Sequence, residues 1–315
     1  MNGTLMESEI YQQPEQLAHN AAAYFDSVRE GLKGHDYQMV LLAARGSSDN
    51  AALYARYLIE IHLRIPVSLA APSVITKFGS DMRFPKCLAV GISQSGAAPD
   101  VAEVLNFMRA SGHGTLAITN TPGSRLTEEA EHTILLNVDA EKSVAATKTY
   151  TASLLALYQA VRALGANLPD PAGHLPDASW LQRTRDEAEE AFGILNRQTV
   201  RFSLGRGFSF ATCCESALKL MECALLPCKA YSTADFQHGP KALAGPESTA
   251  IVYGEAPSGL TDFGCVPIYA PQSDRAELAP LSDVLFGQWL ALFTARSRNL
   301  DPDTPRNLSK VTLTL

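Results

Sequence analysis

The stretch that decides the fold reads Leu88-Ala89-Val90-Gly91-Ile92-Ser93-Gln94-Ser95-Gly96. An apolar run followed by hydroxyls and glycine predicts a buried strand that turns into a helix, and Pro99 and Asp100 are typical of a first helical turn. The first turn leaves backbone N–H groups unpaired and carries a partial positive charge, so it attracts anions. The stretch therefore predicts a phosphate site, although ordinary helix capping by Ser95 explains the tetrapeptide alone equally well.

The composition is that of a globular protein. The 315 residues are 46% hydrophobic and 19% charged, and this length suits about two domains. The net charge of −7 and the lack of a Lys/Arg cluster argue against a nucleic-acid partner. No apolar stretch is long enough to span a bilayer, and residues 1–15 do not resemble a secretory signal. The six cysteines form no C-x-x-C pair, so we expect reduced thiols, a cytoplasmic protein and no metal site.

Apolar runs and helical patterns alternate along the first half of the chain. We expect strands at 38–43, 66–70, 87–92, 115–119 and 133–138, and helices at 16–31, 49–62, 101–110 and 143–164. This alternation predicts an α/β fold with a doubly wound parallel sheet. The glycines and prolines of 165–176 predict a linker. We therefore expect a first domain over 1–168, with a helical lead-in, and a second over 177–315, with a tail that carries active-site residues.

The second half looks like a shortened copy of the first. Gly205-Arg206-Gly207 stands 161 residues after Ala44-Arg45-Gly46, and each triplet follows an expected first strand and precedes a helix. This repeat predicts a tandem duplication. Only ten residues join the expected strands 249–254 and 265–270, whereas a parallel crossover needs about a dozen or more. Either the second copy has lost a crossover helix, or these two strands are not parallel neighbours.

Two loops of the first copy have the residues that a phosphate needs. In open parallel sheets, ligands bind beyond the carboxyl ends of the strands. Gly46-Ser47-Ser48 follows the first expected strand and Ser93-Gln94-Ser95 follows the third, which together supply four hydroxyls and an amide. Hydrogen bonds to a charged group contribute about 1.5–3 kcal/mol each, so these donors could hold a phosphate without a lysine.

One helix of the second copy carries a narrow polar stripe. Glu215, Lys219 and Glu222 are spaced i, i+4 and i+7 on an otherwise apolar helix, so they fall within about 60° of each other. A solvated row of ion pairs is one interpretation of this stripe. The alternative is a pocket in which a carboxylate beside an ammonium group is poised for proton transfer.

Two further residues have a simple structural explanation and a functional one. His238 stands before Gly239-Pro240, which fixes a turn, although a lone histidine is more often structural. Residues 306–315 alternate like an edge strand. Within them, Lys310 is equally well explained as a solvated lysine of the tail.

Taken in order, these motifs resemble the SIS-domain phosphosugar isomerases. The resemblance is strongest to the isomerase half of glutamine–fructose-6-phosphate amidotransferases and to their stand-alone, deaminase-like branch. It covers nearly the whole chain, through motifs at 9–14, 46–48, 93–96, 144–148, 215–222, 238–240 and 305–310.

The resemblance also implies roles for individual residues. The implied substrate-binding and phosphate-binding residues are Gly46, Ser47, Ser48, Ser93, Gln94, Ser95, Val144 through its backbone, and Ser309. Glu222 would be the base that moves a proton between C1 and C2, with Lys219 as its charge partner. His238 would open the sugar ring from the neighbouring subunit of a homodimer. Lys310 would meet the open-chain carbonyl, where it could form an imine. No cofactor is implied.

Departures from the amidotransferase pattern point to one direction of the reaction. Ala97-Ala98-Pro99-Asp100 replaces a Glu-Thr pattern, Ala146 replaces a serine, and no cysteine-led glutaminase precedes these motifs. We therefore expect the releasing direction, in which glucosamine 6-phosphate yields fructose 6-phosphate and ammonia. The alternatives are a fructosamine-6-phosphate deglycase, if the shortened copy leaves a roomier pocket, and a non-catalytic sugar-phosphate sensor. The presence of Glu222, His238 and Lys310 favours an enzyme over a sensor.

Overall fold

A computed structural model of the protein describes residues 2–310, which divide into two compact units. The five-stranded unit comprises residues 16–140 and 149–173, and the four-stranded unit comprises residues 2–15, 141–148 and 174–310. Segments 2–15 and 141–148, expected within the first domain, thus belong to the same unit as the second half of the chain.

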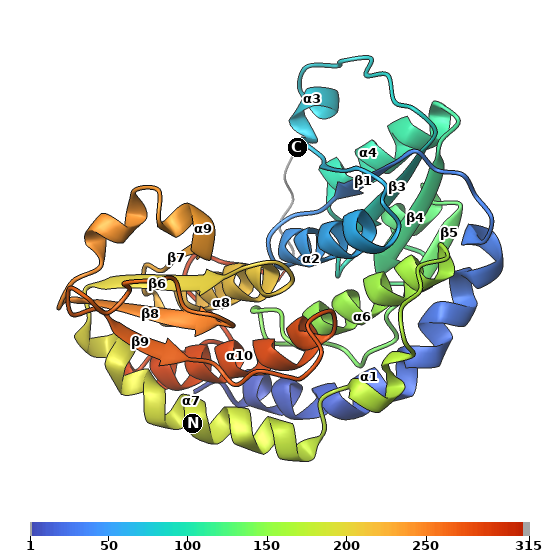
Figure 1. The fold of residues 1–315 in the computed structure, drawn as a ribbon. Helices are drawn as coiled ribbons and strands as arrows, with labels where there is room; N and C mark the ends of the chain where they lie inside the picture. Colours follow the sequence, from blue (N-terminus) through green and yellow to red (C-terminus); the bar gives the residue numbers. More distant parts are fainter. Residues whose placement is uncertain (1, 311–315) are drawn as a thin grey trace. The chain divides into compact units, whose positions relative to one another are not determined.

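The five-stranded unit contains a parallel sheet with the strand order β2-β1-β3-β4-β5 (Figure 1). Its strands are β1 (Met39–Ala43), β2 (Val67–Leu69), β3 (Cys87–Ile92), β4 (Gly114–Thr119) and β5 (His132–Leu135). Its helices are α2 (Ser47–His62), α3 (Ser73–Thr76), α4 (Pro99–Ala110) and α5 (Arg125–Glu128), with parts of α1 (Thr4–Leu32) and α6 (Lys148–Ala163). The order of the strands across the sheet reverses beside β1. Because parallel crossovers are right-handed, helix α2 covers one face of this sheet, and helices α3 and α4 cover the opposite face. The doubly wound α/β fold is confirmed.

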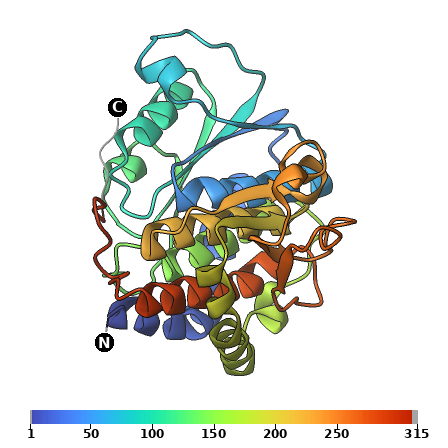
Figure 2. The same ribbon diagram turned by 90° about the vertical axis from the view of Figure 1, so that its left-hand side faces the viewer.

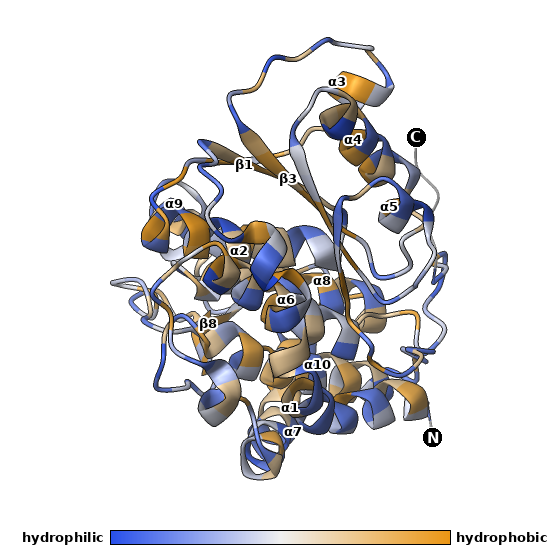
Figure 3. Cartoon of the chain, turned by 90° about the vertical axis from the view of Figure 1, so that its right-hand side faces the viewer, coloured by the Kyte–Doolittle hydropathy of each residue, from blue (hydrophilic) through white to orange (hydrophobic). Residues whose placement is uncertain are grey.

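The central strands of this sheet are hydrophobic along their whole length. Every residue of β3 is buried, and β1 is buried from Val40 onward. Both strands are drawn mostly in the hydrophobic colour in Figure 3. Strands covered by helices on both faces have no polar side, which explains why they appear in the sequence as continuous apolar runs.

The four-stranded unit contains a second parallel sheet with the order β7-β6-β8-β9 (Figure 2). Its strands are β6 (Val200–Gly205), β7 (Lys229–Ser232), β8 (Ser248–Tyr253) and β9 (Val266–Tyr269). Its helices are α7 (Ala178–Arg197), α8 (Ser209–Ala224), α9 (Thr233–Phe236) and α10 (Ala279–Ser297), and 3₁₀ turns occur at Pro171–His174, in the linker of the other unit, and at Pro240–Leu243.

The second sheet repeats the first with one strand fewer. The strand pairing also repeats, because Ala43 faces Gly91 in the first sheet and Leu204 faces Val252 in the second, both offset by 161 residues. β8 and β9 are parallel neighbours, and no helix joins them. The second copy has therefore lost a crossover helix, which settles the choice left open by the sequence.

Helix α10 forms the centre of the four-stranded unit. All of its residues from Ala279 to Ala295 are buried, and it packs against α7 and α8. A helix that is apolar on all sides belongs in a core. Even so, no helix described within residues 2–310 combines the length and hydropathy needed to cross a membrane.

Helix α1 begins well before residue 16, where we expected it, and passes through Pro14. Proline has no N–H to donate, so the carbonyl of Ile10 loses its usual helical partner. The buried side chain of Gln13 replaces that partner: its Nε2 donates to Ile10 O at 3.3 Å and to Gln288 Oε1 at 2.7 Å. The Gln13 amide thus supplies the hydrogen bond that the backbone of Pro14 cannot donate.

Two other expected elements differ. The long helix expected from residue 143 begins at Lys148 instead, because residues 143–147 form a loop held by side chains. The tail shows no strand over residues 306–310, and the rest of the expected edge strand, 311–315, lies outside the described residues.

Candidate functional site

The two serine loops of the five-stranded unit open at the same edge of the sheet, as predicted. Gly46 caps α2 directly after β1, and Ser93 follows β3, the strand that pairs with β1. Ser95 Oγ accepts a hydrogen bond from the backbone N–H of Ala97 at 3.3 Å. The loops thus lie where the strand order reverses, which is the usual place for a ligand of such a sheet.

The loop after β3 has a fixed backbone. Gly96 has a φ of +62°, and a Cβ there would lie 2.0 Å from Ser124 Oγ, so only glycine fits. The carbonyl of Gln94 accepts hydrogen bonds from Thr119 Oγ1 at 3.2 Å and from Asn120 N at 3.0 Å. The side-chain amide of Gln94 makes no hydrogen bond to the described residues. A rigid turn thus presents a side chain that is available to a ligand.

An ion pair that the sequence did not reveal joins the two loops. Arg45, beside Gly46, donates from Nε and Nη2 to Asp100 Oδ2, both at 2.7 Å. Asp100 is buried in the first turn of α4, and its side chain is 2% exposed. Because such charge-assisted bonds are strong and directional, the pair holds the start of α4 against the end of β1. The available signal in the sequence is that Arg45 and Asp100 are charged residues within the otherwise uncharged stretches 44–48 and 93–100.

The polar stripe of α8 is a buried ion cluster and not a solvated row. The side chains of Lys219 and Glu215 are 1% and 0% exposed. Lys219 Nζ lies 2.5 Å from Glu222 Oε2 and 3.4 Å from Glu215 Oε1. Burial lowers the pKa of Lys219, but the two carboxylates outweigh burial and raise its pKa overall. Lys219 therefore remains protonated between two carboxylates.

Glu222 is the member of this cluster that reaches open space. Its side chain is 24% exposed, and it borders a cavity of about 210 Å³ that Leu225, Asp301, Thr304 and Arg306 also line. All of these residues belong to the four-stranded unit. A carboxylate that contacts a fixed cation on one side and a cavity on the other can exchange protons with a bound molecule.

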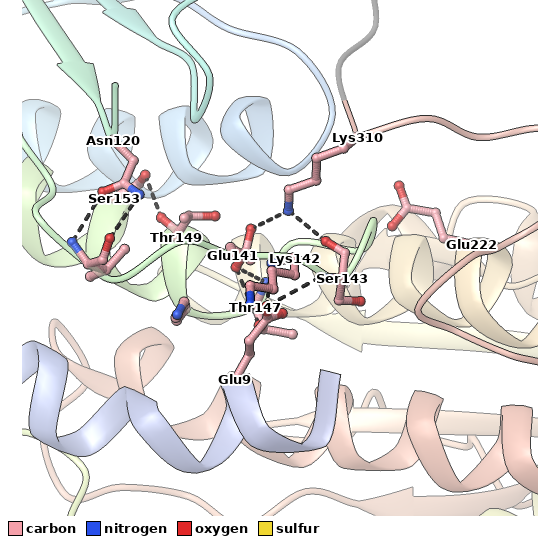
Figure 4. Close-up of polar contacts among 12 residues, drawn as sticks. Glu9, Asn120, Glu141, Lys142, Ser143, Thr147, Thr149, Ser153, Glu222 and Lys310 are labelled. Carbon is pink, nitrogen blue, oxygen red and sulfur yellow. Dashed lines mark hydrogen bonds and ion pairs between the residues drawn. The ribbon is translucent and has the colours of Figure 1, made fainter. Parts of the chain in front are cut away.

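Two buried carboxylates hold the loop of residues 141–147, which contains Val144 (Figure 4). Glu9 Oε1 accepts hydrogen bonds from the backbone N–H groups of Lys142 and Ser143, and burial raises the pKa of Glu9. Glu141 Oε1 accepts from the backbone N–H of Thr147 at 2.9 Å. These bonds give the loop a defined shape even though it has no regular secondary structure.

Lys310 is bound to this loop and is not a solvated lysine. Its Nζ donates to Glu141 Oε2 and to the carbonyl of Ser143, both at 2.7 Å (Figure 4). The segment before it is also attached, because Val144 N donates to Asp303 O at 3.2 Å. Asp303 in turn accepts from Met6 N at 2.8 Å, and Figure 2 shows the start of α1 beside this segment. Glu141 is thus a site residue that sequence reasoning missed.

His238 and Ser309 lie at the surface of the four-stranded unit. The backbone N–H of His238 donates to Asp235 O at 2.9 Å, and Gly239 after it has a φ of +127°. Within residues 2–310, the His238 ring makes no hydrogen bond or ion pair, so it does not join Glu222, Lys219 or Lys310 of its own chain. Ser309 is exposed. The roles of both residues remain predictions.

Among residues 2–310, no three or more His, Cys, Asp or Glu side chains are grouped to hold a metal ion. All six cysteines are free thiols, and five of them are buried.

Comparison with known proteins agrees with this geometry. Residues 36–163 match the family model of the SIS domain, so this part of the chain is an SIS domain. It is 32% identical over 347 residues to the isomerizing glutamine–fructose-6-phosphate aminotransferase of Pyrobaculum aerophilum, covering 97% of this chain and 56% of the relative. The chain is thus homologous to the isomerase part of these enzymes and spans a little over half the length of the curated relatives it matches.

Solved structures show the same fold over nearly the whole chain. A candidate phosphosugar isomerase of Silicibacter pomeroyi is 28% identical, with a TM-score of 0.81 over 96% of this chain and 100% of the other. A glucosamine-6-phosphate deaminase of Thermotoga maritima has a TM-score of 0.83 over 99% of this chain and 100% of the other. At 24% identity, this second likeness shows the shared fold.

Proposed function

We propose that the chain is a phosphosugar isomerase-type enzyme that deaminates an aminosugar phosphate. In its reaction, glucosamine 6-phosphate and water yield fructose 6-phosphate and ammonium. The observation that carries the proposal is the arrangement on α8, where Lys219 is buried between two carboxylates and Glu222 borders a cavity. A merely solvated helix face would not bury two charges that pair with a third.

The comparisons support the substrate class. The Pyrobaculum aerophilum relative is an isomerizing glutamine–fructose-6-phosphate aminotransferase, and the Thermotoga maritima protein is a glucosamine-6-phosphate deaminase. The motifs that resemble the deaminase-like branch are 44–52 and 93–100. These two motifs are joined by the Arg45–Asp100 ion pair, so the residues of the resemblance also form one structural unit.

The proposed binding residues are those that the family resemblance implies. The loops 46–48 and 93–95 would hold the phosphate through hydroxyls, the Gln94 amide and backbone N–H groups. The backbone at Val144, together with Ser309, would contact the sugar. The partner of a homodimer would contribute His238 on its exposed turn.

The proposed chemistry is a proton shift followed by hydrolysis. After ring opening by His238, the Glu222 carboxylate removes the proton from C2 and returns it to C1. The amine nitrogen loses one proton and O1 gains one, so that the C1 aldehyde becomes a hydroxymethyl group and C2 becomes an imine. Lys219, which stays protonated, stabilises the negative charge that develops on O1. Lys310 contacts the same oxygen. Water then adds to C2, the C2–N bond breaks, and the nitrogen leaves as ammonium.

A coupled assay for ammonium tests the proposal. Pure protein with glucosamine 6-phosphate should release ammonium and fructose 6-phosphate in equal amounts at a pH between about 6 and about 9. No turnover across this range would eliminate this substrate. Turnover of fructosamine 6-phosphates alone would establish the deglycase instead. Binding of sugar phosphates without turnover of any of them would indicate a sensor.

A further inference from the structure

A cavity of about 490 Å³ lies at the carboxyl ends of β6, β7 and β8, within the four-stranded unit. Its polar lining consists of Arg206, Ser209, Thr233, Gln237, Glu255 and Ser258. Glu222, Lys219 and Lys310 do not line it, and Glu222 borders a different cavity. The volume is within the range of small-molecule sites, about 300–1,000 Å³. The proposed reaction therefore leaves a cavity of ligand size unused.

This cavity occupies the position in the second sheet that the serine loops occupy in the first. The order β7-β6-β8-β9 reverses between β6 and β8, where open parallel sheets bind their ligands. The offset of 161 residues in the strand pairing aligns Arg206 with Arg45 and Glu255 with Gln94. The duplication has thus kept the site while changing its chemistry, since a neutral amide is replaced by a carboxylate.

The two charged side chains of this cavity are exposed and have no ion-pair partner among the described residues. In the first copy, the guanidinium of Arg45 is bound to the buried Asp100. Its counterpart Arg206 makes no hydrogen bond, ion pair or ring contact with the residues that the structure describes. Glu255 also has no such partner in that part of the chain, and the two side chains do not pair with each other. One positive and one negative group therefore line the same cavity, both open to a ligand.

We propose that this cavity binds a small zwitterion, with an anionic group on Arg206 and a protonated amine on Glu255. A ligand with only negative charge would be repelled by Glu255, and one with only positive charge by Arg206. The hydroxyls of Ser209 and Thr233 offer further hydrogen bonds to either end. Two sources share this chemistry, an amino sugar phosphate and a free α-amino acid. The site is separate from the proposed active site and does not depend on the proposed function.

Calorimetric titration of the full chain tests the site, with glucosamine 6-phosphate, glutamine, fructose 6-phosphate and inorganic phosphate as ligands. The variants are Arg206→Gln and Glu255→Gln, and Lys229→Gln is the matched control because it removes an exposed charge outside the cavity. We expect each of the first two variants to weaken a zwitterion about tenfold or more, since each removes one charge-assisted contact. Fructose 6-phosphate should bind equally to all four proteins.

The ligands distinguish the two sources. If Arg206→Gln and Glu255→Gln weaken the binding of glucosamine 6-phosphate alone, the ligand is an amino sugar phosphate. If they weaken the binding of glutamine alone, the ligand is an amino acid. Either result supports the site. If Arg206→Gln weakens inorganic phosphate while Glu255→Gln changes nothing, the cavity takes simple anions and the zwitterion is wrong. Equal affinities in all four proteins also overturn the proposal. Thermal unfolding confirms that the variants fold, and the ammonium assay is scored separately.

Discussion

At the scale of single residues, the burial of Lys219 sets the chemistry of α8. Removing a buried cation leaves its carboxylates uncompensated, which typically costs about 3–5 kcal/mol. We expect Lys219→Met to lower the free energy of unfolding by that amount, because Glu215 and Glu222 would then repel each other. The double variant Lys219→Met, Glu215→Gln should recover part of the loss. Urea unfolding measures both, and unchanged stability in the single variant would show that the cluster contributes nothing to folding.

Glu222 is the residue on which the proposed proton shift depends. Glu222→Gln keeps the shape of the side chain but cannot accept a proton, so kcat should fall by about 10²–10⁴ while the sugar phosphate still binds. Exchange of the C2 hydrogen with deuterated solvent measures the step directly. Glu190→Gln, on the exposed face of α7, is the matched control and should behave as the wild type. Persistent exchange in Glu222→Gln would refute the assignment of the base.

At the scale of elements, the loop 141–147 positions Lys310 through Glu141. Glu141→Gln removes the ion pair with Lys310 Nζ but can keep the hydrogen bond that Oε1 accepts from Thr147 N. We expect kcat to fall about tenfold or more with KM changed less than about threefold, because phosphate binding belongs to other loops. In a double-mutant cycle with Lys310→Met, the decreases in kcat caused by the two substitutions should not add, because Glu141 acts through Lys310. Additive decreases in kcat would show that Glu141 and Lys310 act independently.

Helix α10 contains a buried acid that makes stability depend on pH. Burial raises the pKa of Asp283 to about 7, although its Oδ1 accepts a hydrogen bond from Ser273 N at 3.1 Å. Because the folded pKa lies above the unfolded value of about 3.9, the stability from this group is complete below pH 4 and is lost as pH rises through 7. The loss is at most about 4 kcal/mol. Asp283→Asn should therefore flatten the dependence of Tm on pH between 4 and 8 and raise Tm at pH 8. An unchanged slope would exclude Asp283 as its source.

The sequence predicts the helices and strands that depend on a local pattern of residues. It does not predict features that depend on contacts between residues far apart in the chain. β3 was predicted with its observed bounds because it is apolar throughout. β7 (Lys229–Ser232) was missed because it is a short edge strand that begins with an exposed lysine. The Gln13 side chain, which replaces the hydrogen bond lost at Pro14, also donates to Gln288, a residue of another helix. Asp100 and Glu141 became site residues only through Arg45 and Lys310, and no spacing rule relates residues so far apart.

At the scale of the whole molecule, the two copies carry different functional residues at equivalent positions. The loop after β3 keeps Ser93-Gln94-Ser95, whereas the equivalent loop after β8 reads Gly254-Glu255-Ala256 and has no hydroxyl. The helix after β6, α8, carries the buried ion cluster instead, while its counterpart α2 begins with Ser47 and Ser48. One copy is thus suited to anion binding and the other to proton transfer, so we expect neither copy alone to catalyse the reaction.

The proposed active unit is a homodimer in which each site takes its histidine, His238, from the partner. Glu222→Gln and His238→Ala should each be nearly inactive as pure proteins. After subunit exchange between the two, about a quarter of the wild-type activity should return, because half of the dimers are mixed and each mixed dimer has one intact site. Each variant exchanged with itself is the control and should stay inactive. If the mixture stays inactive although mixed dimers form, His238 does not act across the interface, and the ring must be opened by a residue of the same chain.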